Sequence, residues 1–231
     1  MNTKYRKTFE AFSDKLRAHT RYLHIALNHT LEEALRIASQ IPVSDKIILE
    51  AGTPLIKRYG TSAISSLKGI RPDLYVIADL KCADLSEKEA MLAYQAGADA
   101  VTAVGTAPIA TLNAFIALCH QYQMDSLIDM MNITDPIRVL RRLPNLPTIV
   151  MLHRGVDETE NNKEKLIPYY KIKQIKGNYN SILVDVGGGD TPREIQSAVF
   201  NDADIVMVWK AFYENPQEIA SIAKKFLEII R

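Results

Sequence analysis

The sequence has no long hydrophobic run and no apolar segment at its N-terminus. Its apolar stretches are only a few residues long, whereas a helix that crosses a bilayer needs about 20 apolar residues in a row. A secretory signal peptide would also place an apolar segment near the first residue, and residues 1–20 carry charges instead. We therefore expect a soluble, cytoplasmic protein without a membrane partner.

An excess of charge of one sign is also lacking. Lys and Arg number 28 and Asp and Glu number 27, so the formal net charge is +1. This balance offers no field that would hold a polyanion, which argues against nucleic-acid binding.

Cysteine is scarce as well. Cys82 and Cys119 lack metal-ligand spacing and are too few for a disulfide framework. We expect both to be reduced thiols.

Eight apolar runs of strand length are present, with helical segments between them. Most runs are rich in Val, Ile and Leu, as strands covered on both faces should be. The runs are residues 22–28, 46–52, 74–80, 99–105, 126–131, 148–153, 181–186 and 204–209, and the helical segments include 86–96, 108–122, 191–200 and 215–231. This alternation predicts an α/β fold with eight βα units, a (β/α)8 TIM barrel. A doubly wound open sheet is the alternative, since six strands suffice for it.

The domain organisation follows from the same pattern. A chain of 231 residues with 47% hydrophobic composition can bury one large core, so residues 21–231 are predicted to form a single barrel domain. Residues 1–20 fall outside the repeat. Their apolar side chains recur at helical spacing, which predicts an amphipathic N-terminal helix packed on the barrel or on a partner subunit. These side chains are Tyr5, Phe9, Phe12 and Leu16.

Polar side chains gather where the predicted strands end. In a barrel of this type the chemistry lies at the C-terminal ends of the strands. Ionisable groups are costly to bury unless they are paired, ligate a metal or take part in chemistry, so their convergence predicts an active site. The residues at these ends are Asn28, Glu50, Asp79, Lys81, Asp129, His153, Arg154, Trp209 and Lys210, with Asp84 just beyond the third strand and the sequence GGGD at 187–190.

A metal site is predicted at the second and third strands. Asp79 and Lys81 are two residues apart, which in a regular strand puts both side chains on one face, toward the barrel mouth. Glu50 on the neighbouring strand brings a second carboxylate close to Asp79. Two carboxylates suit Mg²⁺, which keeps several waters and accepts few protein ligands. The alternative is that Asp79 and Lys81 form a purely structural ion pair.

Two further features point to proton transfer and to a phosphate site. His153 has an ordinary pKa of about 6.5 and would be able to move a proton at a carbon next to a carbonyl, although a single histidine at a strand end is often structural. Gly187, Gly188 and Gly189 precede a Thr-Pro helix start, and glycines before a helix N-terminus are able to hold a phosphate. Lys210, after the eighth strand, would add a positive charge there.

These residues resemble those of the orotidine 5'-monophosphate decarboxylase superfamily, and within it the branch of 3-hexulose-6-phosphate synthases and 3-keto-gulonate-6-phosphate decarboxylases. The similarity covers about residues 22–228. It is carried by LEAGTPLIKRYG at 49–60, ADLKCAD at 78–84, AGADAVTAVG at 96–105, IDMMNITDP at 128–136, LHRGVDE at 152–158 and the glycines at 187–189.

The resemblance implies a Mg²⁺-dependent enzyme that stabilises an enediolate of a phosphorylated sugar. It implies metal ligation by Glu50 and Asp79, and a hydrogen bond from Lys81 to the developing oxyanion. Proton transfer would fall to His153, and Asp129 would orient substrate or metal-bound water. The resemblance further implies a homodimer in which Asp84 reaches into the neighbouring subunit's site.

Single residues discriminate among the reactions of the superfamily. The orotidine decarboxylases have a lysine where this chain has Glu50, which argues against their metal-free chemistry. Asp129 and the sequence RGVDE after His153 resemble the synthases, which add formaldehyde to ribulose 5-phosphate, whereas Arg154 favours the gulonate decarboxylases. We expect an aldolase of the synthase type, a carbon–carbon lyase, with the two decarboxylases as alternatives.

Two positions depart from the family pattern. The family ends its first strand in Asp, whereas this chain has Asn28, which keeps the shape and loses the charge. The family has Gly-Arg after the eighth strand, whereas this chain has Trp209 and Lys210. Lysine meets a phosphate as a point charge without the bidentate contact of arginine. Asn28, Arg154 and Lys210 stay substrate- or phosphate-binding candidates, and the changes leave open a different phosphorylated or nucleotide-like substrate or a diverged, non-catalytic phosphate-binding barrel.

Overall fold

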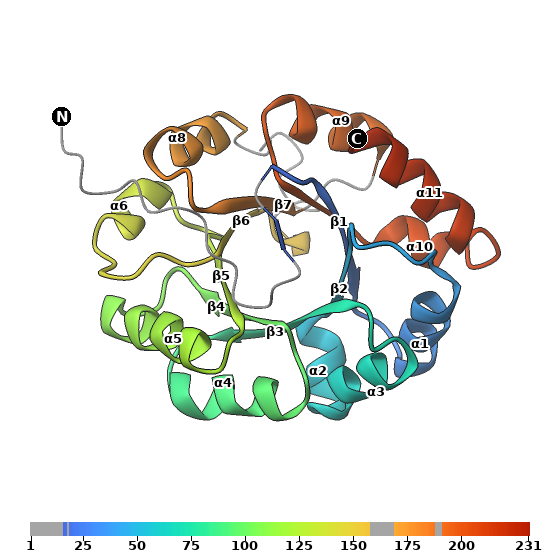
Figure 1. Cartoon of the computed structure of the whole chain (residues 1–231), viewed down its shortest axis with the longest axis horizontal. Helices are drawn as coiled ribbons and strands as arrows, with labels where there is room; N and C mark the ends of the chain where they lie inside the picture. Colours follow the sequence, from blue (N-terminus) through green and yellow to red (C-terminus); the bar gives the residue numbers. More distant parts are fainter. Residues whose placement is uncertain (1–15, 18, 158–168, 188–190) are drawn as a thin grey trace.

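The chain forms a closed barrel of eight parallel strands surrounded by helices (Figure 1). The computed structural model describes residues 16–17, 19–157, 169–187 and 191–231. Each strand pairs with the next in the chain, and β8 pairs with β1. The strands are β1 Tyr22–Leu27, β2 Ile47–Ala51, β3 Tyr75–Cys82, β4 Ala100–Val104, β5 Asp125–Asp129, β6 Ile149–His153, β7 Leu183–Gly187 and β8 Ile205–Val208. The predicted (β/α)8 TIM barrel is confirmed, and the open-sheet alternative is wrong.

Helices cover the outside of the barrel. They are α1 Leu31–Gln40, α2 Thr53–Tyr59, α3 Ser62–Ile70, α4 Ser86–Gln95, α5 Ile109–Gln121, α6 Pro136–Leu140, α8 Tyr170–Asn178, α9 Pro192–Phe200, α10 Lys210–Glu214 and α11 Ile219–Ile229. Capping boxes begin α1 at Thr30 and α9 at Thr191, and in each the threonine side chain accepts from the backbone N–H three residues later. No helix in the described part of the chain combines the length and the apolarity that a bilayer crossing requires.

Two layers of apolar side chains hold the barrel. The outer layer lies between strands and helices and includes Phe115 and Phe226. The inner layer fills the barrel and includes Tyr22 and Leu127. Leu16 packs with this inner layer at 5% exposure, and the backbone N–H of Arg17 donates to the Tyr22 hydroxyl. The N-terminal end of the barrel is therefore closed by apolar groups, and polar groups are left to gather at the other end.

Residues 1–15 and 18 lie outside the described part of the chain, so the expected N-terminal helix stays a prediction. Leu16, Arg17, His19 and Thr20, the described residues of that segment, are not helical. Cys82 and Cys119 are buried free cysteines, as expected.

Gly52, at the turn from β2 into α2, sets how closely two strand ends approach. A Cβ at this position would lie 2.0 Å from Oδ1 of Asn28 and 2.9 Å from the carbonyl oxygen of Leu27. The backbone N–H of Gly52 also donates to that carbonyl, at 2.9 Å. Only a residue without a side chain fits here, so Gly52 fixes the position of Asn28 at the edge of the site.

We expect Gly52→Ala to lower the free energy of unfolding by about 1–3 kcal/mol, because the added methyl group displaces Asn28 and backbone atoms. Urea denaturation measures this. Gly69→Ala is the matched control, since a Cβ at Gly69 in α3 would meet nothing within 4 Å. It should be neutral or stabilise by up to about 1 kcal/mol. Equal effects of the two substitutions would show that Gly52 does not govern the packing.

Candidate active site

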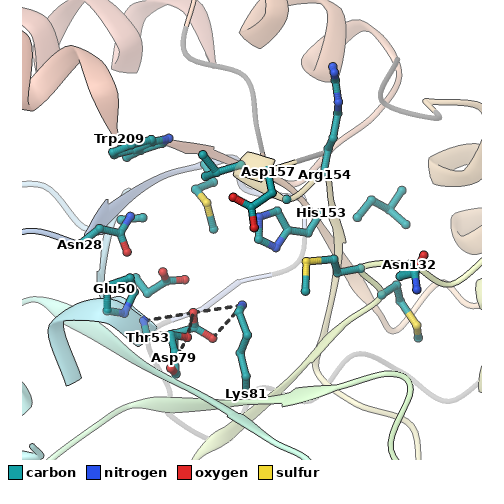
Figure 2. A pocket seen from close by; sticks show the side chains of 18 of the residues that line it. Asn28, Glu50, Thr53, Asp79, Lys81, Asn132, His153, Arg154, Asp157 and Trp209 are labelled. Carbon is teal, nitrogen blue, oxygen red and sulfur yellow. Dashed lines mark hydrogen bonds and ion pairs between the residues drawn. The ribbon is translucent and has the colours of Figure 1, made fainter. Parts of the chain in front are cut away.

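A cavity of about 940 Å³ opens at the C-terminal ends of the strands. Its walls come from the ends of β1, β2, β3, β6 and β8, from the segments that follow these strands and β5, and from Lys171 of α8. Figure 2 shows Glu50, Asp79 and Lys81 on one side, His153 opposite them and Trp209 at the rim. This is the end of the barrel at which the sequence predicts the chemistry.

Most of the predicted site residues meet in this cavity. Those that line it are Asn28, Glu50, Asp79, Lys81, His153, Arg154 and Lys210. Asp129 is fully buried and contacts both Lys81 and His153. Asp84 is exposed on the segment between β3 and α4 and does not line the cavity.

The predicted phosphate glycines are only partly visible. Gly188 and Gly189 lie outside the described residues. Gly187 ends β7 and does not line the cavity. A Cβ there would lie 3.3 Å from Cδ2 of His153, so the glycine leaves room for the imidazole ring. The structure therefore shows Gly187 packing against His153, and its assignment to a phosphate site stays a prediction.

Lys81 links two carboxylates. Its Nζ lies 2.9 Å from Oδ2 of Asp129 and 3.1 Å from Oδ2 of Asp79. Burial alone would lower the pKa of Lys81, but the charges of Asp79, Asp129 and Glu50 outweigh burial and raise it. Nδ1 of His153 contacts the same Oδ2 of Asp129, at 2.9 Å. Asp79, Lys81, Asp129 and His153 thus form one connected chain of charged groups.

Asp79 and Lys81 meet as expected, but regular strand alternation is not the reason. Lys81 has a left-handed backbone with φ 49°. The pairing of β3 with β4 is irregular between Ala78 and Cys82. Non-glycine residues rarely adopt such a backbone, and an irregularity of this kind in a strand redirects a side chain. The irregularity at the end of β3 aims the ammonium group at both carboxylates.

Thr53, in the first turn of α2, anchors Asp79 and was missed by the sequence reasoning. Its backbone N–H and its hydroxyl lie 3.3 and 2.7 Å from Oδ2 of Asp79. Burial, followed by the charge of Glu50, raises the pKa of Asp79, although Lys81 and Thr53 oppose this rise. The available signal was the position of Thr53 directly after Gly52, at a helix start beside the strand ends.

Glu50 is 3% exposed and contacts His24, a second residue that the sequence reasoning missed. Oε2 of Glu50 lies 3.2 Å from Nε2 of His24, whose Nδ1 lies 2.7 Å from Oδ2 of Asp185. Burial would lower the pKa of His24, but Asp185 and Glu50 raise it to about 10. Burial would raise the pKa of Glu50, but His24, Lys81 and His153 lower it.

Glu50 and Asp79 have the chemistry of a magnesium site. The described residues contain no group of three or more His, Cys, Asp or Glu that would hold a metal alone. Mg²⁺ is usually bound by one or two carboxylates together with waters and substrate oxygens, so two carboxylates suffice. Both carboxylates line the cavity, where a cation and its waters have access to them. The donor set therefore fits a hard divalent cation.

An aromatic cluster forms the rim beside β1 and β8. The ring of His29 lies 4.0 Å from that of Tyr213 and 5.9 Å from that of Trp209, measured between centroids. The Tyr213 hydroxyl accepts from the backbone N–H of Asn28 at 2.9 Å. Nζ of Lys210 lies 5.4 Å from the centroid of the Trp209 ring. Trp209, one of the departures from the family pattern, is thus part of a packed rim that includes Asn28, the other departure.

Some residues that line the cavity were given no role by the sequence analysis. Asp157 is one of these and lies near His153 (Figure 2). The side chain of Arg154, which was predicted to bind substrate or phosphate, extends away from Asp79. Lys171 of α8 lines the cavity, and its Nζ donates to the carbonyl of Ile133 at 3.1 Å. Asp157 belongs to the RGVDE stretch, which was the available signal.

The Asp129 carboxylate should make stability depend on pH. Burial would raise its pKa, but His153 and Lys81 lower it from 3.8 to about 2. A carboxyl whose pKa is lowered by folding stabilises the fold above its unfolded pKa, and this contribution is lost as the pH falls toward the folded value. We expect a loss of about 2 kcal/mol across that window.

The test is urea denaturation of the wild type and of Asp129→Asn between about pH 5 and about pH 2.5. The variant should be less stable at neutral pH, and its stability should fall less steeply with acid. Asp45→Asn, which removes an exposed carboxylate, should parallel the wild type. Parallel curves for all three proteins would contradict the assignment.

Comparison with known proteins agrees with this geometry. The model of the orotidine 5'-phosphate decarboxylase / HUMPS family matches residues 21–224. A protein of Methanococcoides burtonii named "Bifunctional enzyme Fae/Hps" is 40% identical over 209 residues, which are 90% of this chain and 52% of that protein. The chain therefore spans about half the length of the curated relatives it matches.

Two solved structures titled 3-hexulose-6-phosphate synthase are similar as well. One is 28% identical with a TM-score of 0.80, over 91% of this chain and 100% of its own. The other, from Salmonella typhimurium, is 26% identical with a TM-score of 0.81, over 90% of this chain and 98% of its own. With a family model that covers nearly the whole barrel, this chain belongs to the orotidine 5'-phosphate decarboxylase / HUMPS family.

Proposed function

We propose that this protein is a Mg²⁺-dependent aldolase of the 3-hexulose-6-phosphate synthase type, acting as a cytoplasmic homodimer. Such a carbon–carbon lyase joins ribulose 5-phosphate to formaldehyde through an enediolate. The observation that carries the proposal is the Glu50 and Asp79 pair beside Lys81, with His153 across the same cavity. The titles of the two solved structures above 25% identity support this choice of reaction.

Glu50 and Asp79 are the residues that would hold the metal. When bound, Mg²⁺ supplies positive charge that lowers the energy of a developing oxygen anion. Lys81 adds a second positive charge, because its raised pKa keeps it protonated. Asp79 and Asp129 hold its Nζ from two sides, so the donor is positioned before the substrate arrives.

His153 is the residue for proton transfer. Its Nδ1 contacts Asp129, which leaves Nε2 to act on the substrate. In the proposed reaction His153 takes the proton from C1 of ribulose 5-phosphate, and the electrons of the broken C–H bond form the enediolate. The enediolate carbon then bonds to the formaldehyde carbon, the C2 carbonyl forms again, and the formaldehyde oxygen receives the proton that His153 holds. Asp129 stabilises the protonated imidazole in between, as its effect on the His153 pKa indicates.

The dimer part of the proposal rests on Asp84. This carboxylate is exposed just beyond β3 and lies outside the cavity of its own chain. A second subunit that placed its cavity against this segment would receive Asp84 as an added site residue. Measurement of the molar mass in solution, by light scattering, tests the assembly.

Proton exchange tests the metal and enediolate assignment. In D₂O with Mg²⁺, proton NMR should show loss of a C1 proton of ribulose 5-phosphate, and formaldehyde should then yield a hexulose phosphate. Glu50→Gln and Asp79→Asn should each slow exchange by about 100-fold or more, since each removes a charged ligand. Thermal unfolding should show that both variants remain folded.

The control is Glu32→Gln, on the exposed side of α1, which should exchange like the wild type. Chelation of the metal should stop exchange in the wild type. Exchange that survives chelation and both site substitutions would refute the proposed metal site.

Lys210→Ala tests the phosphate assignment. Loss of a point charge that binds phosphate should raise KM for ribulose 5-phosphate about tenfold and change kcat little. Lys224→Ala, exposed on α11, is the charge-matched control. An unchanged KM for Lys210→Ala would mean that another cation of the cavity, such as Lys171, binds the phosphate.

A further inference from the structure

Three ionisable side chains lie inside the barrel, next to the proposed metal site, in a place where such barrels normally hold branched apolar residues. His24 of β1 and Asp185 of β7 are fully buried, and Glu50 of β2 is nearly so. His24 lies between the two carboxylates, with Nδ1 in contact with Asp185 and Nε2 in contact with Glu50. The proposed reaction gives no role to His24 or Asp185.

Ionisable side chains are costly to bury, so the presence of three of them inside the barrel needs a physical reason. An ionised carboxylate in a dry interior is tolerated when it is paired and hydrogen-bonded. The 2.7 Å contact between Nδ1 of His24 and Oδ2 of Asp185 fixes the imidazole ring. Because the ring is fixed at Nδ1, its other nitrogen is directed at Oε2 of Glu50, 3.2 Å away.

The contact with Glu50 differs from that with Asp185. Nε2 of His24 and Oε2 of Glu50 are within ion-pair distance, but they are not aligned as a hydrogen bond, and neither atom has another hydrogen-bond partner among the described residues. His24 therefore holds Oε2 from inside the barrel while Glu50 lines the cavity. The negative charge of Asp185 offsets the positive charge of the His24 imidazole. The His24 and Asp185 pair therefore supports the Glu50 carboxylate and adds little net positive charge that would repel a bound metal cation.

We propose that His24 and Asp185 are positioning residues that hold the Glu50 carboxylate in place for a divalent cation. The inference rests on the proposed function, because it takes Glu50 as a metal ligand. Groups that orient metal-binding side chains typically affect metal affinity or activity by about 10- to 100-fold when they are removed. His24 and Asp185 act through Glu50 and do not line the cavity themselves.

The test uses Mn²⁺ as a substitute for Mg²⁺. For each variant, the Mn²⁺ affinity is measured by electron paramagnetic resonance and compared with the thermal unfolding midpoint. The main variant combines His24→Met with Asp185→Leu, since replacing a buried ion pair by apolar groups is often tolerated. We expect it to fold and to bind Mn²⁺ about tenfold more weakly or worse. His24→Gln with Asp185→Asn keeps hydrogen-bonding groups at both positions and should recover affinity to within about threefold of the wild type.

Tyr75→Phe is the matched control for a purely structural effect. The Tyr75 hydroxyl donates to Oδ2 of Asp125 at 2.8 Å, in another buried polar pair at the opposite end of the barrel. This variant should lower the unfolding midpoint and leave Mn²⁺ affinity unchanged. If Mn²⁺ affinity fell in proportion to the unfolding midpoint in every variant, Tyr75→Phe among them, the inference would be overturned.

The outcomes separate the two proposals. Wild-type affinity in the folded Met/Leu variant, with normal binding in the wild type, would overturn the positioning role and leave the proposed function intact. No Mn²⁺ binding and no C1 exchange by the wild type would overturn both. If the Met/Leu variant does not fold, Asp185→Ala alone decides, because it removes the acceptor that fixes Nδ1 of His24. An unchanged affinity there would mean that the orientation of His24 is irrelevant to Glu50.

Discussion

The site depends on one constraint, which is that carboxylates buried inside a barrel need cations next to them. Lys81 meets this need for Asp79 and Asp129 at once, and His24 meets it for Glu50 and Asp185. Each cation thus joins two carboxylates from different strands. The same pairs that make burial tolerable also fix the positions of the groups that would bind metal and substrate.

The closed barrel makes this arrangement possible. Parallel strands bring their carboxyl ends to one edge, and closure sets β1 beside β8, so residues distant in the sequence face one cavity. The apolar plug that includes Leu16 and Tyr22 closes the other end. Glycines then adjust the fit, since Gly52 admits Asn28 and Gly187 admits the His153 ring.

The sequence predicted the strands and the residues at their ends well, because both follow from local patterns. Asp79 and Lys81 were correctly placed together, although the reason lies in the irregular backbone at Lys81, which no alternation rule contains. His24 was missed because an isolated histidine in an apolar run has no local signal. Its meaning depends on Asp185, 161 residues away, and only barrel closure brings the two into contact. Thr53 was missed for a similar reason, since its partner Asp79 lies on the next strand.

The aromatic rim has a practical consequence for how this protein is observed. Trp209 is the single tryptophan of the chain, and it borders the cavity beside His29 and Lys210. The intrinsic ultraviolet emission of tryptophan therefore originates at the mouth of the site. The emission spectrum of this protein will therefore report events at that mouth rather than an average over the fold.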